Sequence, residues 1–253
     1  MGSVISADFL ANEVRLSRMQ QRTTLFLCNL AMFIVKNALR LHYGEDYSVR
    51  CLQASRAFQL VLERIGLQAR LFGGDVCFAE AFANPSPEFH FGGFWDQDHH
   101  IWCVTEFTEI VDLTISQMHL HPARTRPDGL VIPPVWWDDV SRWPVTIKYL
   151  SKGQLRLDLP DADAADLAKF EQIVISVSEN VLKQLEPDDV PEIDMLHGPD
   201  VMNELHAAGH PWVVGTMRFQ SEHVPMPDYI VQREAELVRE WESRRPGEGD
   251  KPV

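Results

Sequence analysis

The spacing of apolar residues changes its period near residue 67, and this change is the strongest constraint on how the chain folds. Over residues 7–42, apolar side chains recur every three or four positions, which is typical of one face of an α-helix. A second helical pattern starts near Ser48 and ends at Gly66, while Gly44 is positioned to terminate the first. Shorter apolar segments with strand-like alternation then follow. We expect strands at 68–72 and 76–82, around a turn at Gly73-Gly74-Asp75, and at 100–107 and 109–113.

The C-terminal part returns to helical patterns after one more predicted hairpin, at 145–150 and 154–159. Helices are expected at 163–185, 198–209 and 227–243. With 253 residues, the chain has room for one large domain or for one domain with an appendage. We expect a core over residues 1–160 and an acidic, mainly helical extension over residues 161–253 that packs on it.

Charge and cysteine usage limit the classes of partner and the compartment. The net charge is −14, and residues 151–253 carry 21 acidic against 10 basic residues, so we expect neither nucleic acid nor an anionic membrane as a partner. The four cysteines show no CxxC spacing, which favours reduced thiols in a cytoplasmic protein. The most apolar window, 25–35, is interrupted by Asn29 and is too short to span a bilayer, so it predicts a buried core helix.

Cys51 stands in the first turn of a predicted helix. The free N–H groups and the positive end of a helix N-terminus favour the thiolate, which is the nucleophilic form of cysteine. Taken alone, a cysteine on the apolar face of a helix is more often a small core residue. The position therefore becomes informative only if a base lies nearby.

His100 and Asp112 supply the groups that such a thiol needs. His100 opens one predicted strand and Asp112 closes the next, so a hairpin about Thr108 would bring the two side chains to the same end of neighbouring strands. A carboxylate among apolar residues needs a partner, and an imidazole would serve. Cys51, His100 and Asp112 then form a nucleophile, a base and an orienting acid.

Around these three residues the sequence resembles the transglutaminase-like superfamily of papain-like cysteine enzymes. The matching segments are CLQASRAFQLVLERIGLQARLFGG, HIWCV and EIVDLT, within residues 45–118. The resemblance implies an α+β fold in which N-terminal helices pack on an antiparallel sheet, with a helical C-terminal extension. The positions that match the family pattern are Cys51, Ala54, Gly66, Ala69, His100, Trp102, Asp112 and Thr114.

The same resemblance implies acyl transfer through a thioester. Cys51 would attack an amide carbonyl, His100 would carry the proton and Asp112 would orient His100, so we expect a thiol-dependent amide or peptide hydrolase or acyltransferase: a protease, a deamidase or a transglutaminase-like enzyme. The substrate would be a peptide or protein amide, contacted by Trp102 and by Trp95 in the loop that precedes His100. The mechanism requires no cofactor and no metal.

Two alternatives remain open, and one residue assignment is ambiguous. His99 directly precedes His100, although the His-x-Trp pattern and strand alternation favour His100 as the base. A non-catalytic protein-binding module could use the same fold. A metal-dependent hydrolase could use histidines and carboxylates of two loops. Those candidate ligands are His90, Asp96, Asp98, His99, His100, His119 and His121.

Overall fold

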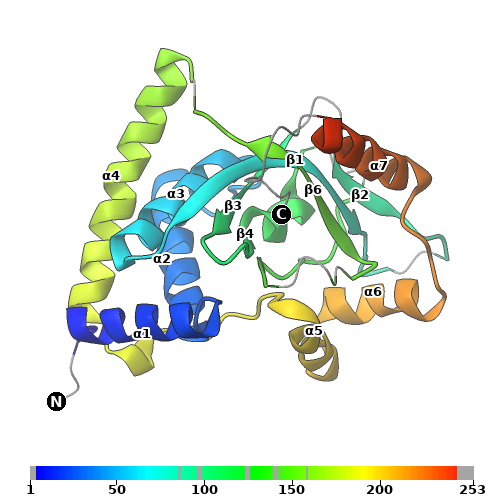
Figure 1. Ribbon diagram of the computed structural model, residues 1–253. Helices are drawn as coiled ribbons and strands as arrows, with labels where there is room; N and C mark the ends of the chain where they lie inside the picture. Colours follow the sequence, from blue (N-terminus) through cyan, green and yellow to red (C-terminus); the bar gives the residue numbers. More distant parts are fainter. Residues whose placement is uncertain are drawn as a thin grey trace.

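The computed structural model describes residues 4–84, 87–95, 99–122, 126–138, 142, 144–157 and 159–243. Helices and a curled antiparallel sheet make up an α+β structure, as the sequence led us to expect (Figure 1). The helices are α1 (Ala7–Gln20), α2 (Leu25–Tyr43), α3 (Cys51–Ile65), α4 (Asp161–Gln184), α5 (Gly198–Ala207), α6 (Pro211–Ser221) and α7 (Asp228–Ser243), with 3-10 turns η1 (Thr114–Leu120) and η3 (Pro187–Asp189). The strands are β1 (Ala69–Ala79), β2 (Phe91–Phe94), β3 (His100–Thr105), β4 (Ile110–Asp112), β5 (Val135–Trp137) and β6 (Ile147–Gln154).

The helical segment 7–42 is divided into two helices, and a buried carboxylate accounts for the break. Glu109 is 1% exposed, and it accepts hydrogen bonds from the backbone N–H of Thr23 (2.7 Å) and from the Thr23 hydroxyl (2.5 Å). Thr105 donates a third bond to the same carboxylate. A buried carboxylate must be hydrogen-bonded. The chain between α1 and α2 therefore leaves the helical conformation at Thr23 and donates hydrogen bonds to Glu109.

The two strands expected around Gly73-Gly74-Asp75 are one continuous strand, β1, so the expected turn is wrong. The register of β1 against β6 shifts between Gly73 and Gly74, which marks a bulge. A Cβ at Gly74 would lie 2.1 Å from the Leu150 carbonyl oxygen and 2.9 Å from the Trp102 ring. Gly74 therefore permits a close approach of β6 and of the Trp102 ring to β1, and it does not reverse the chain.

β1 is the central strand of the sheet. The strand order is β2-β1-β3-β4-β5, with β6 on the other side of β1, and these pairings are antiparallel. The expected hairpin at 145–150 and 154–159 is instead the single strand β6, which continues through Ser151 to Gln154 against β1. β2 and β3 therefore lie end to end along one edge of β1.

The two faces of the sheet alternate as strand geometry requires, and each is covered by different helices. Cys103 and Val111 belong to a core shared with α2, α3 and α4. Trp102 and Ile110 face a second core that includes side chains of α5 and α6. α7 packs beside β6, where Ile230 meets Leu150. Helix α6 was not expected from the sequence.

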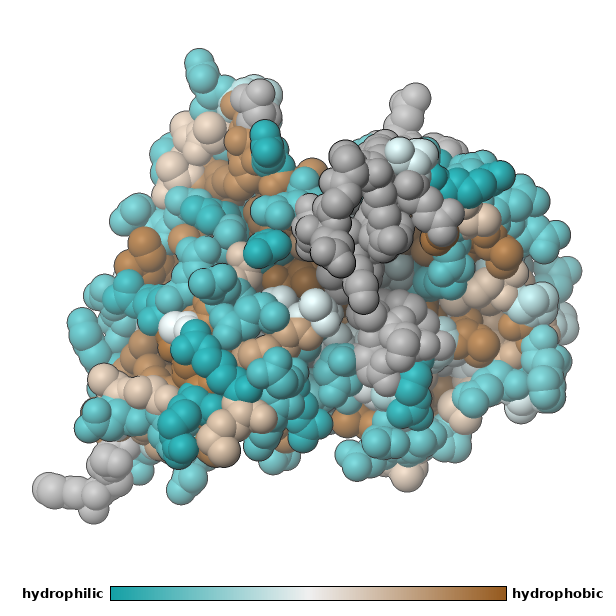
Figure 2. Space-filling view, viewed as in Figure 1, coloured by the Kyte–Doolittle hydropathy of each residue, from teal (hydrophilic) through white to brown (hydrophobic). Residues whose placement is uncertain are grey.

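α2 is a core helix. Its 18-residue window has a mean hydropathy of 1.3, so by length and composition alone it could cross a membrane. In the structure it packs against α3 and α4, and 56% of that window is buried. On the face shown in Figure 2, hydrophilic and hydrophobic residues are interspersed.

Candidate active site

His100 and Asp112 form a buried pair at one end of the β3–β4 hairpin. The His100 Nε2 atom lies 2.6 Å from the Asp112 Oδ2 atom, and the two side chains are 2% and 1% exposed. Cys103 pairs with Val111 and Val104 with Ile110, so the register places residues 100 and 112 at the same end of the hairpin, away from its turn. The hairpin turns at Thr108, which has a φ of 66°. The sequence-based expectation for this geometry is confirmed.

Both oxygens of Asp112 have partners that hold the carboxylate in one orientation. Oδ1 accepts from the Thr114 hydroxyl (2.9 Å) and from the backbone N–H of Ile115 (3.2 Å), at the start of η1. Oδ2 accepts from the Tyr149 hydroxyl (2.7 Å) of β6 as well as from His100. These donors stabilise the ionised form and offset the cost of burying it.

Cys51 is the first residue of α3, and its thiol reaches the same imidazole. The residue is partly exposed, and the His100 ring and the backbone N–H of Ile101 are the groups that stabilise its thiolate and lower its pKa. One turn further along α3, the Ser55 hydroxyl donates to the Ile101 carbonyl at 3.0 Å. The helix is thus pinned to β3 beside the sulfur, because residues i and i+4 share a helix face.

The contacts among these three residues shift their pKa values. Burial disfavours the Cys51 thiolate, but the hydrogen bond to His100 and the charge of the imidazole outweigh burial and lower the pKa of the thiol below 9.0. Burial likewise disfavours the His100 cation, but the Asp112 carboxylate reverses this and raises the pKa of His100 to about 10. Burial also opposes ionisation of Asp112, and the charge of His100 nevertheless lowers its pKa below 3.8.

The nitrogen used by Asp112 fixes the chemical role of the imidazole. His100 presents Nε2 to Asp112, so Nδ1 is left for the Cys51 thiol. An ionised carboxylate only accepts hydrogen bonds, so Nε2 carries a proton. In the neutral ring Nδ1 is then the acceptor, which is the state that can take a proton from sulfur.

The two tryptophans expected at the substrate site do not line it. Trp102 is 1% exposed, and its ring lies 6.4 Å from that of His100, beneath the imidazole. Trp95 packs with α7, where its ring is 5.0 Å from that of Tyr229. Strand alternation turns Trp102 into the core beneath the sheet, and Trp95, which follows Phe94 at the end of β2, lies on the opposite face from Phe94. The aromatic ring that covers His100 is instead Phe94, which the sequence analysis missed.

The alternative base and the alternative metal ligands are arranged differently. His99 is exposed and lies 3.2 Å from the Lys152 ammonium group, so it is not the histidine that contacts Asp112. Asp96 and Asp98 lie outside the described residues. Among the residues that the structure does describe, no three His, Cys, Asp or Glu side chains converge as metal ligands.

A second Cys-His-Asp set lies elsewhere and has the opposite electrostatic character. The Cys28 sulfur is 3.7 Å from His197 Nε2, and His197 Nδ1 is 3.9 Å from Asp138 Oδ2. Cys28 is fully buried, and burial together with the charge of Glu109 raises its pKa well above 9.0. This thiol stays protonated, so it serves as an internal comparison for Cys51.

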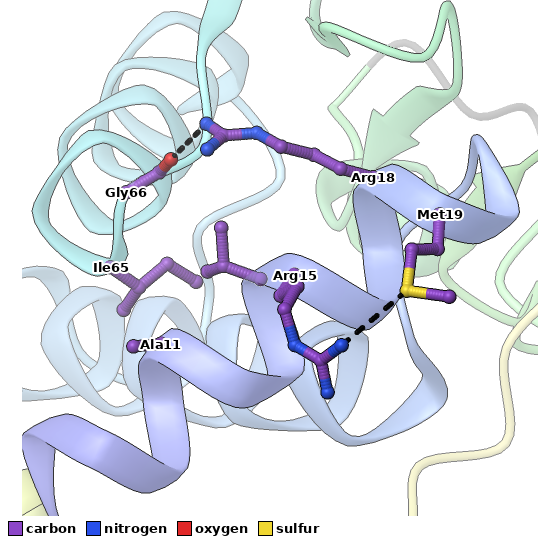
Figure 3. A pocket seen from close by; sticks show the side chains of 7 residues that line it. Ala11, Arg15, Arg18, Met19, Ile65 and Gly66 are labelled. Atoms are coloured by element: carbon purple, nitrogen blue, oxygen red, sulfur yellow. Dashed lines mark hydrogen bonds between the residues drawn. The ribbon is translucent and has the colours of Figure 1, made fainter.

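Two of the surface hollows in the described part of the chain are lined by residues other than Cys51. One, of about 850 Å³, lies where the start of α2 meets the start of α5, and Asn29, Asp138 and His197 are among its lining residues. The other, of about 530 Å³, lies between α1 and the end of α3, with Arg15, Arg18 and Ile65 on its wall (Figure 3). Arg18 donates to the Gly66 carbonyl there. Ile65 is roughly 20 Å along α3 from Cys51 at the rise of an α-helix.

The structure defines this chain as an α+β protein, and comparisons with known proteins do not assign it to a family. No family model matches the sequence, and neither does any curated protein. A similar solved structure is the crystal structure of genomics APC5867, with 13% sequence identity and a TM-score of 0.32 over 64% of this chain and 82% of that one. A likeness at that level carries no inference about this chain.

Proposed function

We propose that this protein is a thiol-dependent amide hydrolase or acyltransferase, with Cys51 as nucleophile, His100 as general base and acid, and Asp112 as the residue that orients His100. The observation that carries the proposal is the buried His100–Asp112 pair at 2.6 Å, beside a partly exposed cysteine that begins α3 and whose pKa His100 lowers. On this proposal the α+β fold is of transglutaminase-like type, and the substrate is a peptide or protein amide in the cytoplasm.

The proposed reaction needs only groups that this chain contains, the substrate and an acceptor. The thiol proton of Cys51 passes to Nδ1 of His100, and the resulting thiolate attacks the carbonyl carbon. The carbon–nitrogen bond then breaks, the leaving amine takes the proton from Nδ1, and a thioester remains on Cys51. Water or an amine then attacks the thioester carbon and gives a proton to Nδ1; the carbon–sulfur bond breaks, the acid or the new amide leaves, and the proton returns to sulfur. The backbone N–H of Cys51, at the N-terminus of α3, is suited to stabilise the oxyanion.

Asp112 keeps His100 in the tautomer that this cycle requires. An imidazolium forms at each proton transfer, and a buried carboxylate 2.6 Å away lowers its energy. The raised pKa of His100 and the lowered pKa of Cys51 have the signs expected of a thiolate–imidazolium pair. A binding module on the same fold would not need this pairing, so the contacts favour catalysis.

The proposal is tested with p-nitrophenyl acetate, a small activated ester that reports acyl transfer before the natural amide is identified. We expect a burst of nitrophenol and a mass increase of one acetyl group on Cys51. Cys51→Ala should abolish the burst, and His100→Ala should slow it by about 100-fold or more, since general-base catalysis contributes that much. Cys28→Ala is the matched control and should leave the burst intact.

Other results would sink the proposal. A burst of unchanged size in Cys51→Ala would mean that another group is acylated. An equal rate in His100→Ala would mean that the imidazole does not activate the sulfur, and the non-catalytic alternative would then be preferred.

A further inference from the structure

Phe94 and His100 are brought together by the arrangement of β2 and β3 along β1. Phe94 pairs with Val76 and His100 pairs with Gly74, on the same edge of β1. Val76 and Gly74 are two positions apart, so their partners point to the same face of the sheet, roughly 7 Å apart. The register of two separate strands thus sets the aromatic ring beside the imidazole.

Phe94 is the outermost member of a stack of rings that includes His100. The Phe94 and His100 rings are 5.2 Å apart at an interplanar angle of 9°. Trp102 lies on the inner side of His100, and both are almost fully buried, whereas Phe94 is partly exposed. His121 meets the Phe94 ring edge-on at 5.0 Å. Phe94 is therefore the partly exposed aromatic ring that lies against the imidazole on which the proposed reaction depends.

We infer that Phe94 is a specificity-determining residue that favours substrates with a planar, apolar group beside the scissile carbonyl. The inference rests on the proposed function, since it takes Cys51 as the nucleophile. A partly exposed aromatic ring gains dispersion and loses contact with water when a flat group covers it. The neighbouring imidazole is held by Asp112, so the position of the reacting atoms and of the aromatic wall are set together.

The test compares two alkylating reagents with one reactive group, chloroacetamide and N-benzylchloroacetamide. In both, the Cys51 thiolate attacks the methylene carbon, the new sulfur–carbon bond forms, and chloride leaves with the carbon–chlorine electron pair. We expect the benzyl reagent to label Cys51 about 10-fold faster, which corresponds to one favourable aromatic contact. Labelling is followed by mass spectrometry of the intact chain and its peptides.

Phe94→Ala should reduce the ratio of the two rates to within about twofold, because the contact is lost while the reaction is unchanged. Phe94→Leu, which keeps apolar volume, should also lower the ratio, and it serves if the alanine variant is unfolded. Phe91→Ala is the matched control: Phe91 lies on the same strand but packs against Phe219, and it should leave the ratio unchanged.

Equal rates for the two reagents on the wild-type protein would overturn the inference, as would a preference that survives in Phe94→Ala. These results leave the proposed function standing if Cys51 is still labelled far faster than Cys28. If neither reagent selects Cys51 over Cys28, the proposed function fails, and this inference fails with it.

Discussion

The Tyr149 hydroxyl donates to the Oδ2 atom of Asp112 at 2.7 Å, the same oxygen that His100 contacts. Tyr149 is 4% exposed, and its ring packs edge-on against that of Trp102, with the ring centroids 5.1 Å apart. Strand β6 thereby reaches across β1 to the site, although it supplies none of the three reacting groups. Tyr149 is a positioning residue for Asp112.

Tyr149→Phe should destabilise the protein by roughly 1–3 kcal/mol, because it leaves a buried carboxylate oxygen short of one donor. The donors of Asp112 lower its pKa, so its contribution to stability is present above the unfolded value of 3.8 and is lost as pH falls through the folded value. Losing one donor moves the folded pKa upward, and the variant should lose stability earlier on acidification. Urea unfolding at several pH values measures both effects.

Tyr43→Phe provides the control for that variant. Tyr43 also donates to a carboxylate, Asp166 at 2.9 Å, but that carboxylate is exposed to water. Its loss should cost less than the loss of the Tyr149 hydroxyl. Equal costs for the two variants would show that Tyr149 has no special role in holding Asp112.

Asp112→Asn should reduce turnover by about three to four orders of magnitude. The backbone N–H of Ile115 is a fixed donor to one side of residue 112, so the amide NH₂ must face His100. His100 then accepts at Nε2 and carries its proton on Nδ1, where it cannot take a proton from Cys51. Measured burst rates with p-nitrophenyl acetate test this, and a rate within tenfold of wild type would contradict it.

The raised pKa of His100 predicts how stability depends on pH. Because the folded value is about 10 and the unfolded value is 6.5, the contribution is complete below pH 6.5 and is lost as pH rises through about 10. The difference in unfolding free energy between wild type and His100→Gln should therefore be largest below pH 6.5 and shrink steadily as the pH rises from there to about 10. Thermal unfolding across this range measures it, and a difference that grows with pH would mean that the imidazole is neutral in the folded protein.

Gly74→Ala should be far more disruptive than Gly73→Ala. The new methyl group at Gly74 would meet a backbone carbonyl at 2.1 Å, while at Gly73 it would meet only the flexible end of Leu155 at 3.3 Å. We expect a cost of roughly 1–3 kcal/mol or more for Gly74→Ala and a much smaller one for Gly73→Ala. Chemical denaturation compares the two, and similar costs would contradict the close crossing at Gly74.

The sequence predicted the His100–Asp112 contact and the helix start at Cys51 better than it predicted the strands. The positions of Cys51, His100 and Asp112 depend on one helix start and one tight hairpin, which are local features. The glycine pair at 73–74 resembles a turn in sequence. The structure explains why the strand continues: β6 and the Trp102 ring both approach Gly74 too closely for a side chain. Local pattern cannot reveal the contact between Gly74 and Leu150, which lie 76 positions apart.

The aromatic residues show the same limit. Phe94 and Trp95 are neighbours in sequence, and the sequence analysis placed Trp95 rather than Phe94 at the substrate site. Their faces depend on where β2 ends, and that end is set by pairing with Val76. The partners of Asp112 divide in the same way: Thr114 is two residues away and matched the family pattern, whereas Tyr149 comes from a distant strand.

The hydrogen bond from Ser55 to the Ile101 carbonyl joins the helix that bears the sulfur to the strand that bears the imidazole. A shift of α3 along its axis would break this bond as well as the contact between sulfur and ring. On the proposed function, the nucleophile and its base are thus tied together by a contact outside the reacting groups, so a rearrangement that opens the site while keeping this bond would involve the segments around α3 and β3.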